Sequence, residues 1–151
     1  MTGRLRRFRV EKLIRDGLPE IMRAQGLAVF DRRLEDAAYI AALKDKLVEE
    51  AGEASASVSR DDLIEELADL SEVVIALSAA AGITPDEIEG MRLTKRAERG
   101  GFDARVYNAA VQAPDGTPAI DYYVARAEQY PEITSQDATD EARPPAGPGP
   151  A

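Results

Sequence analysis

Residues Leu43–Asp69 read LKDKLVEEAGEASASVSRDDLIEELAD. This stretch carries two acidic pairs, Glu50-x-x-Glu53 and Glu66-x-x-Asp69. Residues three apart share one face of a helix, and apolar residues recur every three or four positions through both halves of the stretch. The pattern therefore predicts two amphipathic helices, each with one acidic pair beside its apolar stripe.

The two helices are expected to form an antiparallel hairpin. The first should run from about Ala37 to Val58 with Asp36 as N-cap, and the second from Asp62 to Ala81 with Asp61 as N-cap. The connection from residue 59 to 61 is short, and short connections join antiparallel neighbours. This arrangement brings the two acidic pairs towards each other.

Carboxylates beside apolar surface need a compensating charge, since several of them together repel one another. A hard divalent cation meets that need, and oxygen ligands favour magnesium, manganese or calcium over zinc. The predicted metal ligands are Glu50, Glu53, Glu66 and Asp69. The alternative is that these acids form ordinary solvated helix faces, as is expected first of Glu49, Glu65 and Glu72, although Glu49 or Glu72 could also serve as a ligand or base.

Composition excludes several kinds of chemistry. The 151 residues include no histidine and no cysteine, so there is no imidazole base, thiolate, disulfide or conventional zinc site. A net charge of −9 argues against binding a nucleic-acid polymer. No signal peptide and no apolar run of membrane-spanning length are present, so we expect a cytoplasmic protein with no membrane partner.

The remaining pattern predicts an all-α protein, an antiparallel helical bundle with minor short strands. A capping-box sequence, Thr84-Pro85-Asp86-Glu87, should start a third long helix that ends near Arg99. Shorter helices are expected at Glu20–Gln25 and Ala119–Gln129, and short strands at Leu27–Arg33 and Ala104–Val111. Residues 1–133 should form one domain with its core at about 8–106, and the Pro/Ala/Gly-rich tail 134–151 should be disordered.

Three cations, Lys95, Arg96 and Arg99, precede Gly100-Gly101 at the end of the third long helix. Basic residues followed by glycine are also typical of a plain helix end. Together with an acidic metal site, however, such cations are suited to holding phosphate oxygens. The combination indicates an enzyme that acts on a phosphate substrate with a metal.

In order along the chain, these residues resemble the MazG-like all-α nucleoside triphosphate pyrophosphohydrolases. Glu49-Glu50-x-x-Glu53 followed by Glu66-x-x-Asp69 resembles the superfamily signature. The opening Lys12-Leu13-Ile14-Arg15-Asp16 and the ending Lys95-Arg96-x-x-Arg99-Gly100-Gly101-Phe102 are similar to the small single-domain branch that resembles phosphoribosyl-ATP pyrophosphohydrolase. The resemblance covers about residues 8–106.

The resemblance implies Mg²⁺, with Mn²⁺ as a second candidate, held by the four predicted ligands, and cleavage of a nucleoside triphosphate to a monophosphate and pyrophosphate. Glu50 or Glu53 would act as the base for water, and the choice between them stays open. Phosphates would bind Lys95, Arg96 and Arg99, with Lys12 and Arg15 as further candidates. The resemblance also implies a homodimer or homotetramer.

The sequence is therefore compatible with three functions. The first is pyrophosphohydrolysis of nucleoside triphosphates, including the clearance of noncanonical nucleotides. The second is the narrower hydrolysis of phosphoribosyl-ATP. The third, from another class, is a non-enzymatic helical interaction module whose acids are surface charges, which predicts no effect of divalent metal on stability.

Overall fold

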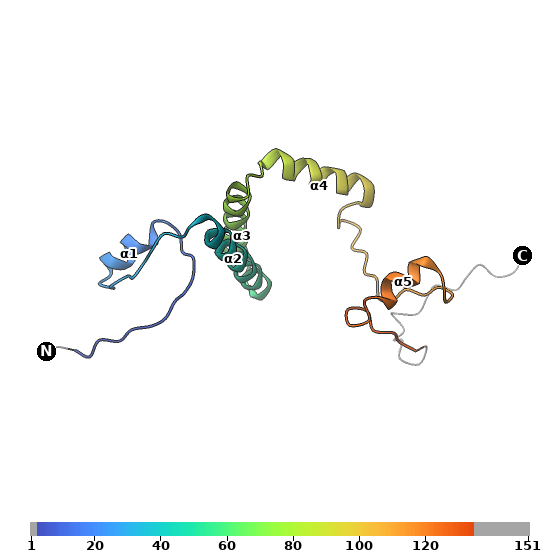
Figure 1. Cartoon of the computed structure of the whole chain (residues 1–151), viewed down its shortest axis with the longest axis horizontal. Coiled ribbons are helices and arrows are strands. Elements are labelled where there is room, and N and C mark those ends of the chain that lie inside the picture. Colours follow the sequence, from blue (N-terminus) through green and yellow to red (C-terminus); the bar gives the residue numbers. More distant parts are fainter. Residues whose placement is uncertain (1–2, 135–151) are drawn as a thin grey trace, which may run out of the picture. The chain divides into compact units, whose positions relative to one another are not determined.

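The computed structural model describes residues 3–134, and these residues form helices and no strand. The helices are α1 (Leu18–Ala24), α2 (Asp36–Ala56), α3 (Arg60–Ala80), α4 (Pro85–Arg99) and α5 (Pro118–Val124) (Figure 1). The all-α class predicted from the sequence is confirmed. The predicted tail, 134–151, lies outside the described residues except for Thr134.

The chain divides after Arg99 into two units. The first contains α1 to α4 and therefore both acidic pairs, whereas the second contains α5. In the second unit, Tyr122, Tyr123 and Tyr130 form a cluster with ring centroids 5.1–6.0 Å apart. The helix there is shorter than predicted and stops at Val124, because turn hydrogen bonds such as that from Gln129 N to Arg126 O replace the helical pattern.

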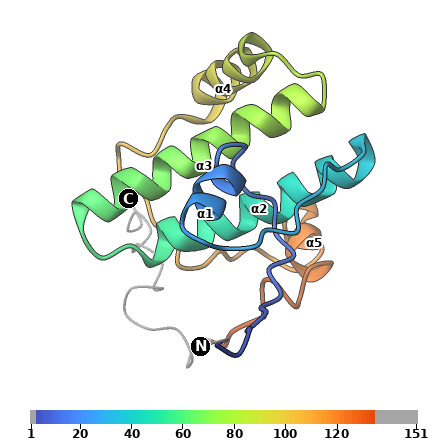
Figure 2. The ribbon, with the colours of Figure 1, turned by 90° about the vertical axis from the view of Figure 1, so that its left-hand side faces the viewer.

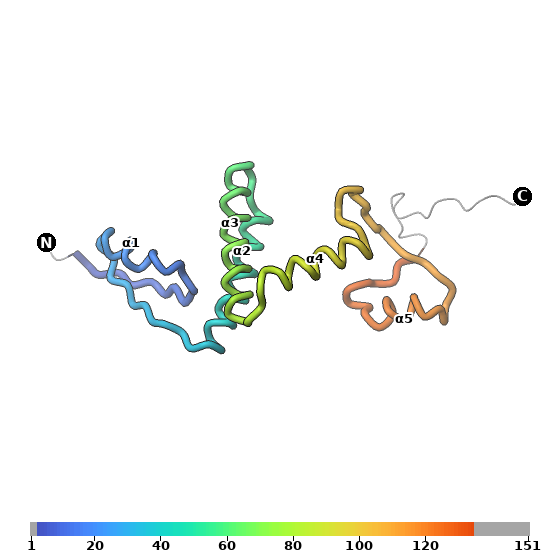
Figure 3. Tube along the Cα trace, turned by 90° about the horizontal axis from the view of Figure 1, so that it is seen from above, coloured from blue at the N-terminus to red at the C-terminus, as the bar shows by residue number. Residues whose placement is uncertain are grey.

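The centre of the first unit is the antiparallel hairpin of α2 and α3, which lie side by side in Figures 2 and 3. Ser59 begins α3 with a capping box, since its Oγ accepts from Asp62 N at 3.0 Å and its own N–H donates to Asp62 Oδ2 at 3.3 Å. The predicted cap at Asp61 was wrong because Ser59 has the extended backbone that a cap requires. Similarly, Glu35 and not Asp36 is the N-cap of α2.

The two short strands predicted at Leu27–Arg33 and Ala104–Val111 are absent, and both segments are irregular. Their apolar and β-branched residues suit a strand locally. A strand is stable, however, only when its backbone groups pair with a neighbouring strand, and no partner strand exists among residues 3–134. The segments therefore remain loops.

Helix α4 starts as predicted and then departs from the hairpin. Thr84 and Glu87 form the capping box: Glu87 Oε2 accepts from Thr84 N at 2.7 Å, and Glu87 N donates to Thr84 Oγ1 at 3.3 Å. The axis of α4 is bent by 113° from that of α3, at a turn where Gly82 has a φ of +70°. Among the described helices none is by itself long and apolar enough to cross a membrane; α3 and α4 pass that test only as this bent pair.

Few side chains are buried within the single chain. Among the described residues the buried apolar side chains are Leu43 on α2 and Val73 on α3, where the two helices face each other. The third buried residue is an acid, Glu50, with 4% of its surface exposed. The hairpin thus encloses one of the predicted metal ligands together with its small apolar core.

Candidate metal and phosphate site

The hairpin brings the predicted acidic ligands together. Carboxylate oxygens of Glu50, Glu66 and Asp69 lie within 4.8 Å of one another, and so do those of Glu49, Glu50 and Glu53. Glu50 belongs to both groups and connects α2 to α3. We call these five residues the acidic cluster. All four predicted ligands are in it, and Glu49 joins them.

Glu50 is the buried centre of the acidic cluster. Its Oε1 forms an ion pair with Lys46 Nζ at 2.7 Å, while its buried Oε2 has no protein partner among the described residues. Glu66 Oε2 is also buried and has no partner within residues 3–134. Burying such oxygens unpaired is costly, and a hard cation held by carboxylates would satisfy both. The donor set therefore fits a hard divalent cation.

Glu53 lies on the exposed side of the acidic cluster. Its hydrogen-bonding approach to the Glu50 carboxyl, and next the negative charge of that group, raise the pKa of Glu53, with smaller contributions from desolvation and from Glu66. A carboxylate whose pKa is raised is a stronger base than an ordinary carboxylate. Glu53 is thus suited chemically to take a proton from water.

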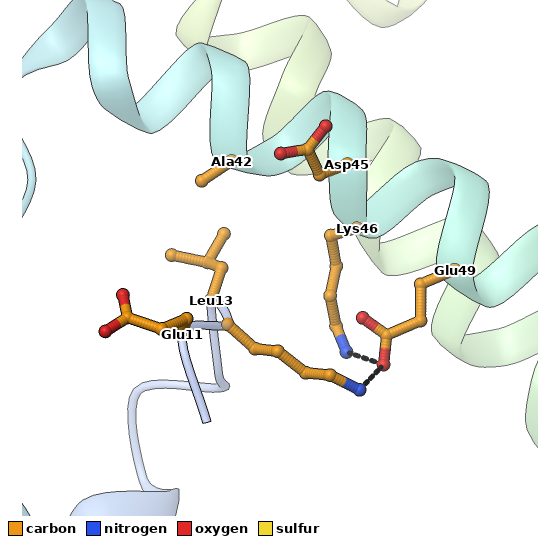
Figure 4. Close-up of a pocket in the computed structure, with 7 residues that line it drawn as sticks. Glu11, Leu13, Ala42, Asp45, Lys46 and Glu49 are labelled. Atoms are coloured by element: carbon orange, nitrogen blue, oxygen red, sulfur yellow. Dashed lines mark hydrogen bonds and ion pairs between the residues drawn. The ribbon is translucent and has the colours of Figure 1, made fainter. Parts of the chain in front are cut away.

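Two lysines converge on Glu49 at the edge of the acidic cluster (Figure 4). Lys12 Nζ lies 2.8 Å and Lys46 Nζ 3.5 Å from Glu49 Oε1, and the hydrogen bond from Lys12 is the main reason that the pKa of Glu49 is lowered. A cavity of about 70 Å³ lies between α2 and the segment that precedes α1. It is lined by Glu11, Lys12, Leu13, Ala42, Asp45, Lys46 and Glu49. Burial lowers the pKa of Lys46, but the hydrogen bond and charge of Glu50, followed by those of Glu49, raise it overall.

Arg15 contacts the acidic cluster at Asp69. Its Nη2 donates to Asp69 Oδ1 on α3, and this hydrogen bond is the main cause of the raised pKa of Arg15, with the charge of Asp69 next. The structure therefore places Lys12 and Arg15, two of the predicted phosphate-binding residues, at the acidic cluster. In this chain both contact carboxylates.

The other predicted phosphate-binding residues lie elsewhere. Lys95, Arg96 and Arg99 are in the last turns of α4, which runs away from the hairpin beyond its 113° bend (Figures 1 and 3). At about 1.5 Å per residue, Lys95 is roughly 15 Å along α4 from the start of that helix. The single chain thus does not bring this basic group to the acidic cluster.

Lys46 was not predicted from the sequence as a residue of the site. The signal was present, because Lys46 precedes Glu49 by three positions and Glu50 by four, the spacings at which helical side chains meet. Lys44 and Lys46 both lie in this stretch, and only the direction of the apolar stripe distinguishes them.

The segment that carries the acidic cluster is similar to a known protein family. The family model described as phosphoribosyl-ATP pyrophosphohydrolase matches residues 19–91, which include the whole acidic cluster. An uncharacterized protein of Mycolicibacterium smegmatis (strain ATCC 700084 / mc(2)155) is 44% identical over 54 residues, which cover 36% of this chain and 55% of that protein. The match thus spans about half the length of that relative. No solved structure matches the chain.

Proposed function

We propose that the protein is a metal-dependent nucleoside triphosphate pyrophosphohydrolase, because residues 19–91 match the phosphoribosyl-ATP pyrophosphohydrolase family, part of the MazG-like all-α superfamily. The substrate would be cleaved between its α and β phosphates to give a nucleoside monophosphate and pyrophosphate. The observation that carries the proposal is the pair of unpartnered oxygens, Glu50 Oε2 and Glu66 Oε2, in a family segment that acts on phosphate anhydrides.

The residues of the acidic cluster divide the chemistry between them. Glu50, Glu66 and Asp69 would hold Mg²⁺ or Mn²⁺, which supplies neutralisation of phosphate charge and activation of water. Glu53 is the preferred general base, because it is exposed and its pKa is raised, whereas Glu50 is buried and paired with Lys46. Water forms a new bond to phosphorus, the bridging P–O bond breaks, and Glu53 takes the proton from water.

Substitution of the acids tests this assignment. Glu50→Gln and Asp69→Asn should each lower kcat at least about 100-fold by weakening metal binding. Glu53→Gln should lower kcat by roughly 10²–10⁴-fold if Glu53 is the base. Glu65→Gln, next to Glu66 but outside the acidic cluster, is the matched control and should retain activity. Pyrophosphate release with Mg²⁺ and with chelator gives the readout, and full activity of Glu50→Gln and Asp69→Asn would reject the site.

The description of the matching family favours a second candidate, phosphoribosyl-ATP, as the specific substrate. A panel of ordinary, deoxy and damaged triphosphates together with phosphoribosyl-ATP separates the two. Strong preference for phosphoribosyl-ATP would establish the narrower function. Preference for a damaged or noncanonical triphosphate would instead support a role in clearing such nucleotides.

A further inference from the structure

The cations at the acidic cluster are of two kinds. Lys46 belongs to α2 itself and holds the buried Glu50. Lys12 and Arg15 come from residues 11–16, a segment before α1 that we call the N-terminal strap. The strap lies across the hairpin, since Lys12 binds Glu49 on α2 and Arg15 binds Asp69 on α3, 37 and 54 positions away in sequence.

The two ion pairs of the strap are more exposed than the pair of Lys46 with Glu50. The side chains of Lys12 and Arg15 are 54% and 56% exposed, and those of their partners Glu49 and Asp69 are 24% and 44% exposed. In the third pair, Lys46 is 21% and Glu50 5% exposed. Ion pairs between exposed side chains add little to stability, because water competes with them and both side chains lose rotamer freedom. The strap pairs can therefore break at small cost, while the pair of Lys46 with Glu50 is held in place by burial.

The carboxylates that the strap occupies are also candidate metal ligands. Glu49 belongs to one group of converging oxygens and Asp69 to the other. A divalent cation on these groups would repel an ammonium or guanidinium a few ångströms away. The same metal brings polyphosphate with it, and phosphate oxygens are strong partners for Lys and Arg.

We propose that Lys12 and Arg15 are exchangeable counter-ions, a role that rests on the proposed function. Without metal they neutralise Glu49 and Asp69, and when metal and nucleotide bind they release these carboxylates and bind phosphate oxygens. The strap thereby couples metal loading to phosphate recognition. Lys46 remains on Glu50 throughout.

Exchange and simple positioning predict opposite changes in metal affinity. If the strap competes with metal, removing its cations strengthens metal binding. If the strap only orients the carboxylates for metal, removing its cations weakens it. The two roles therefore separate in a binding measurement that needs no turnover.

The experiment titrates the full-length protein with Mn²⁺ alone, by calorimetry, and then with inorganic pyrophosphate at saturating Mn²⁺. Lys12→Met and Arg15→Gln should each tighten Mn²⁺ binding roughly two- to fivefold, the range expected for losing one exposed competing ion pair. Each should weaken pyrophosphate binding about tenfold through loss of a charge-assisted hydrogen bond. Arg92→Gln is the matched control, because Arg92 forms an exposed pair with Glu89 on α4 at 2.7 Å, and it should change neither affinity.

Arg15→Lys keeps the charge and should bind Mn²⁺ like the wild type, and Lys12→Met carries the test if Arg15→Gln does not fold. Unchanged or weaker Mn²⁺ binding by the folded variants would overturn the exchange and leave the proposed function standing. Absence of Mn²⁺ binding by the wild type would overturn both. Tighter Mn²⁺ binding with unchanged pyrophosphate binding would overturn the transfer of the cations to phosphate.

Discussion

Glu50 is an acidic residue that is buried and belongs to both groups of candidate ligands. The stability of the acidic cluster therefore depends on a positive charge beside Glu50. Lys46 provides that charge at 2.7 Å from Oε1, while the buried Oε2 has no protein partner among the described residues. Removing the cation that is paired with a buried carboxylate is strongly destabilising. The stability of the hairpin without metal therefore depends on Lys46.

Replacing Lys46 by methionine should lower the free energy of unfolding by about 1–3 kcal/mol, the usual cost of leaving one buried polar group unsatisfied. Added Mg²⁺ should restore part of this loss, since it binds the folded state at the same carboxylate. Urea denaturation with and without Mg²⁺ measures both effects. Lys44→Met is the control on the same helix, where the side chain is exposed. Equal stability of the two variants would contradict this role of Lys46.

The sequence predicted which acids converge. It also predicted Lys12 and Arg15 as phosphate-binding residues of the site, but not their ion pairs with the acids, and it did not predict Lys46. Each acidic pair has a spacing of three residues, which places its two members on one face of a helix. A short connection between the helices is enough to bring the two faces together. The pairing of Arg15 with Asp69 spans 54 positions and follows from the path of an irregular segment. No local pattern encodes such a path.

At the scale of the element, the start of α4 provides a pH-dependent contribution. The backbone N–H of Thr84, and next its hydroxyl, hold the pKa of Glu87 below its ordinary value of 4.5. The folded state therefore binds this proton less tightly than the unfolded state. The stabilisation is fully present above pH 4.5 and is lost as the pH falls through the lowered pKa of the folded state.

Glu87→Gln should accordingly be less stable than the wild type at pH 7, with a difference that shrinks as the pH falls through the lowered pKa of Glu87 in the folded state. Glutamine keeps a side-chain acceptor for the capping box, so the remaining difference reports the charge. Thermal unfolding followed by circular dichroism between pH 3 and pH 7 measures it. Parallel stability curves for the two proteins would contradict the assignment.

The helices themselves were the most predictable elements. Hydrophobic periodicity and capping residues placed α2, α3 and α4 within two residues of their observed bounds. The strands at Leu27–Arg33 and Ala104–Val111 were predicted wrongly because strand formation depends on a partner that composition does not reveal. Helices satisfy their backbone locally, which is why the local sequence describes them better.

In a single chain, part of the apolar surface of the hairpin is exposed to solvent. Ile64 and Ile75 lie eleven residues apart on one face of α3, with 49% and 61% of their surfaces exposed. Large exposed apolar residues that share one face of a helix favour an interaction surface there. We propose that a second copy of the chain covers this face and gives the homodimer or homotetramer implied by the resemblance.

The variant Ile64→Asp/Ile75→Asp should therefore shift the protein to monomer. Burial of one isoleucine stabilises by about 1.5–3 kcal/mol, so the dissociation constant should rise at least about 100-fold for the pair. Light scattering after size-exclusion chromatography, over a range of concentrations, measures the mass. Val124→Asp is the control, because Val124 is exposed on α5 in the other unit. A wild-type monomer at all concentrations would reject the assembly.

Assembly also gives the basic end of α4 a way to reach an acidic cluster. We expect Arg99 of one copy to serve the hairpin of another, since the bend after α3 directs α4 away from its own hairpin. Glu50→Gln and Arg99→Gln dimers, each weakly active, should then regain about a quarter of wild-type activity when mixed 1:1 and allowed to exchange subunits, because half of the dimers are mixed and each has one intact site. Pyrophosphate release measures the recovery. If Arg99 acts on its own hairpin, the mixed dimers contain no intact site and mixing restores nothing.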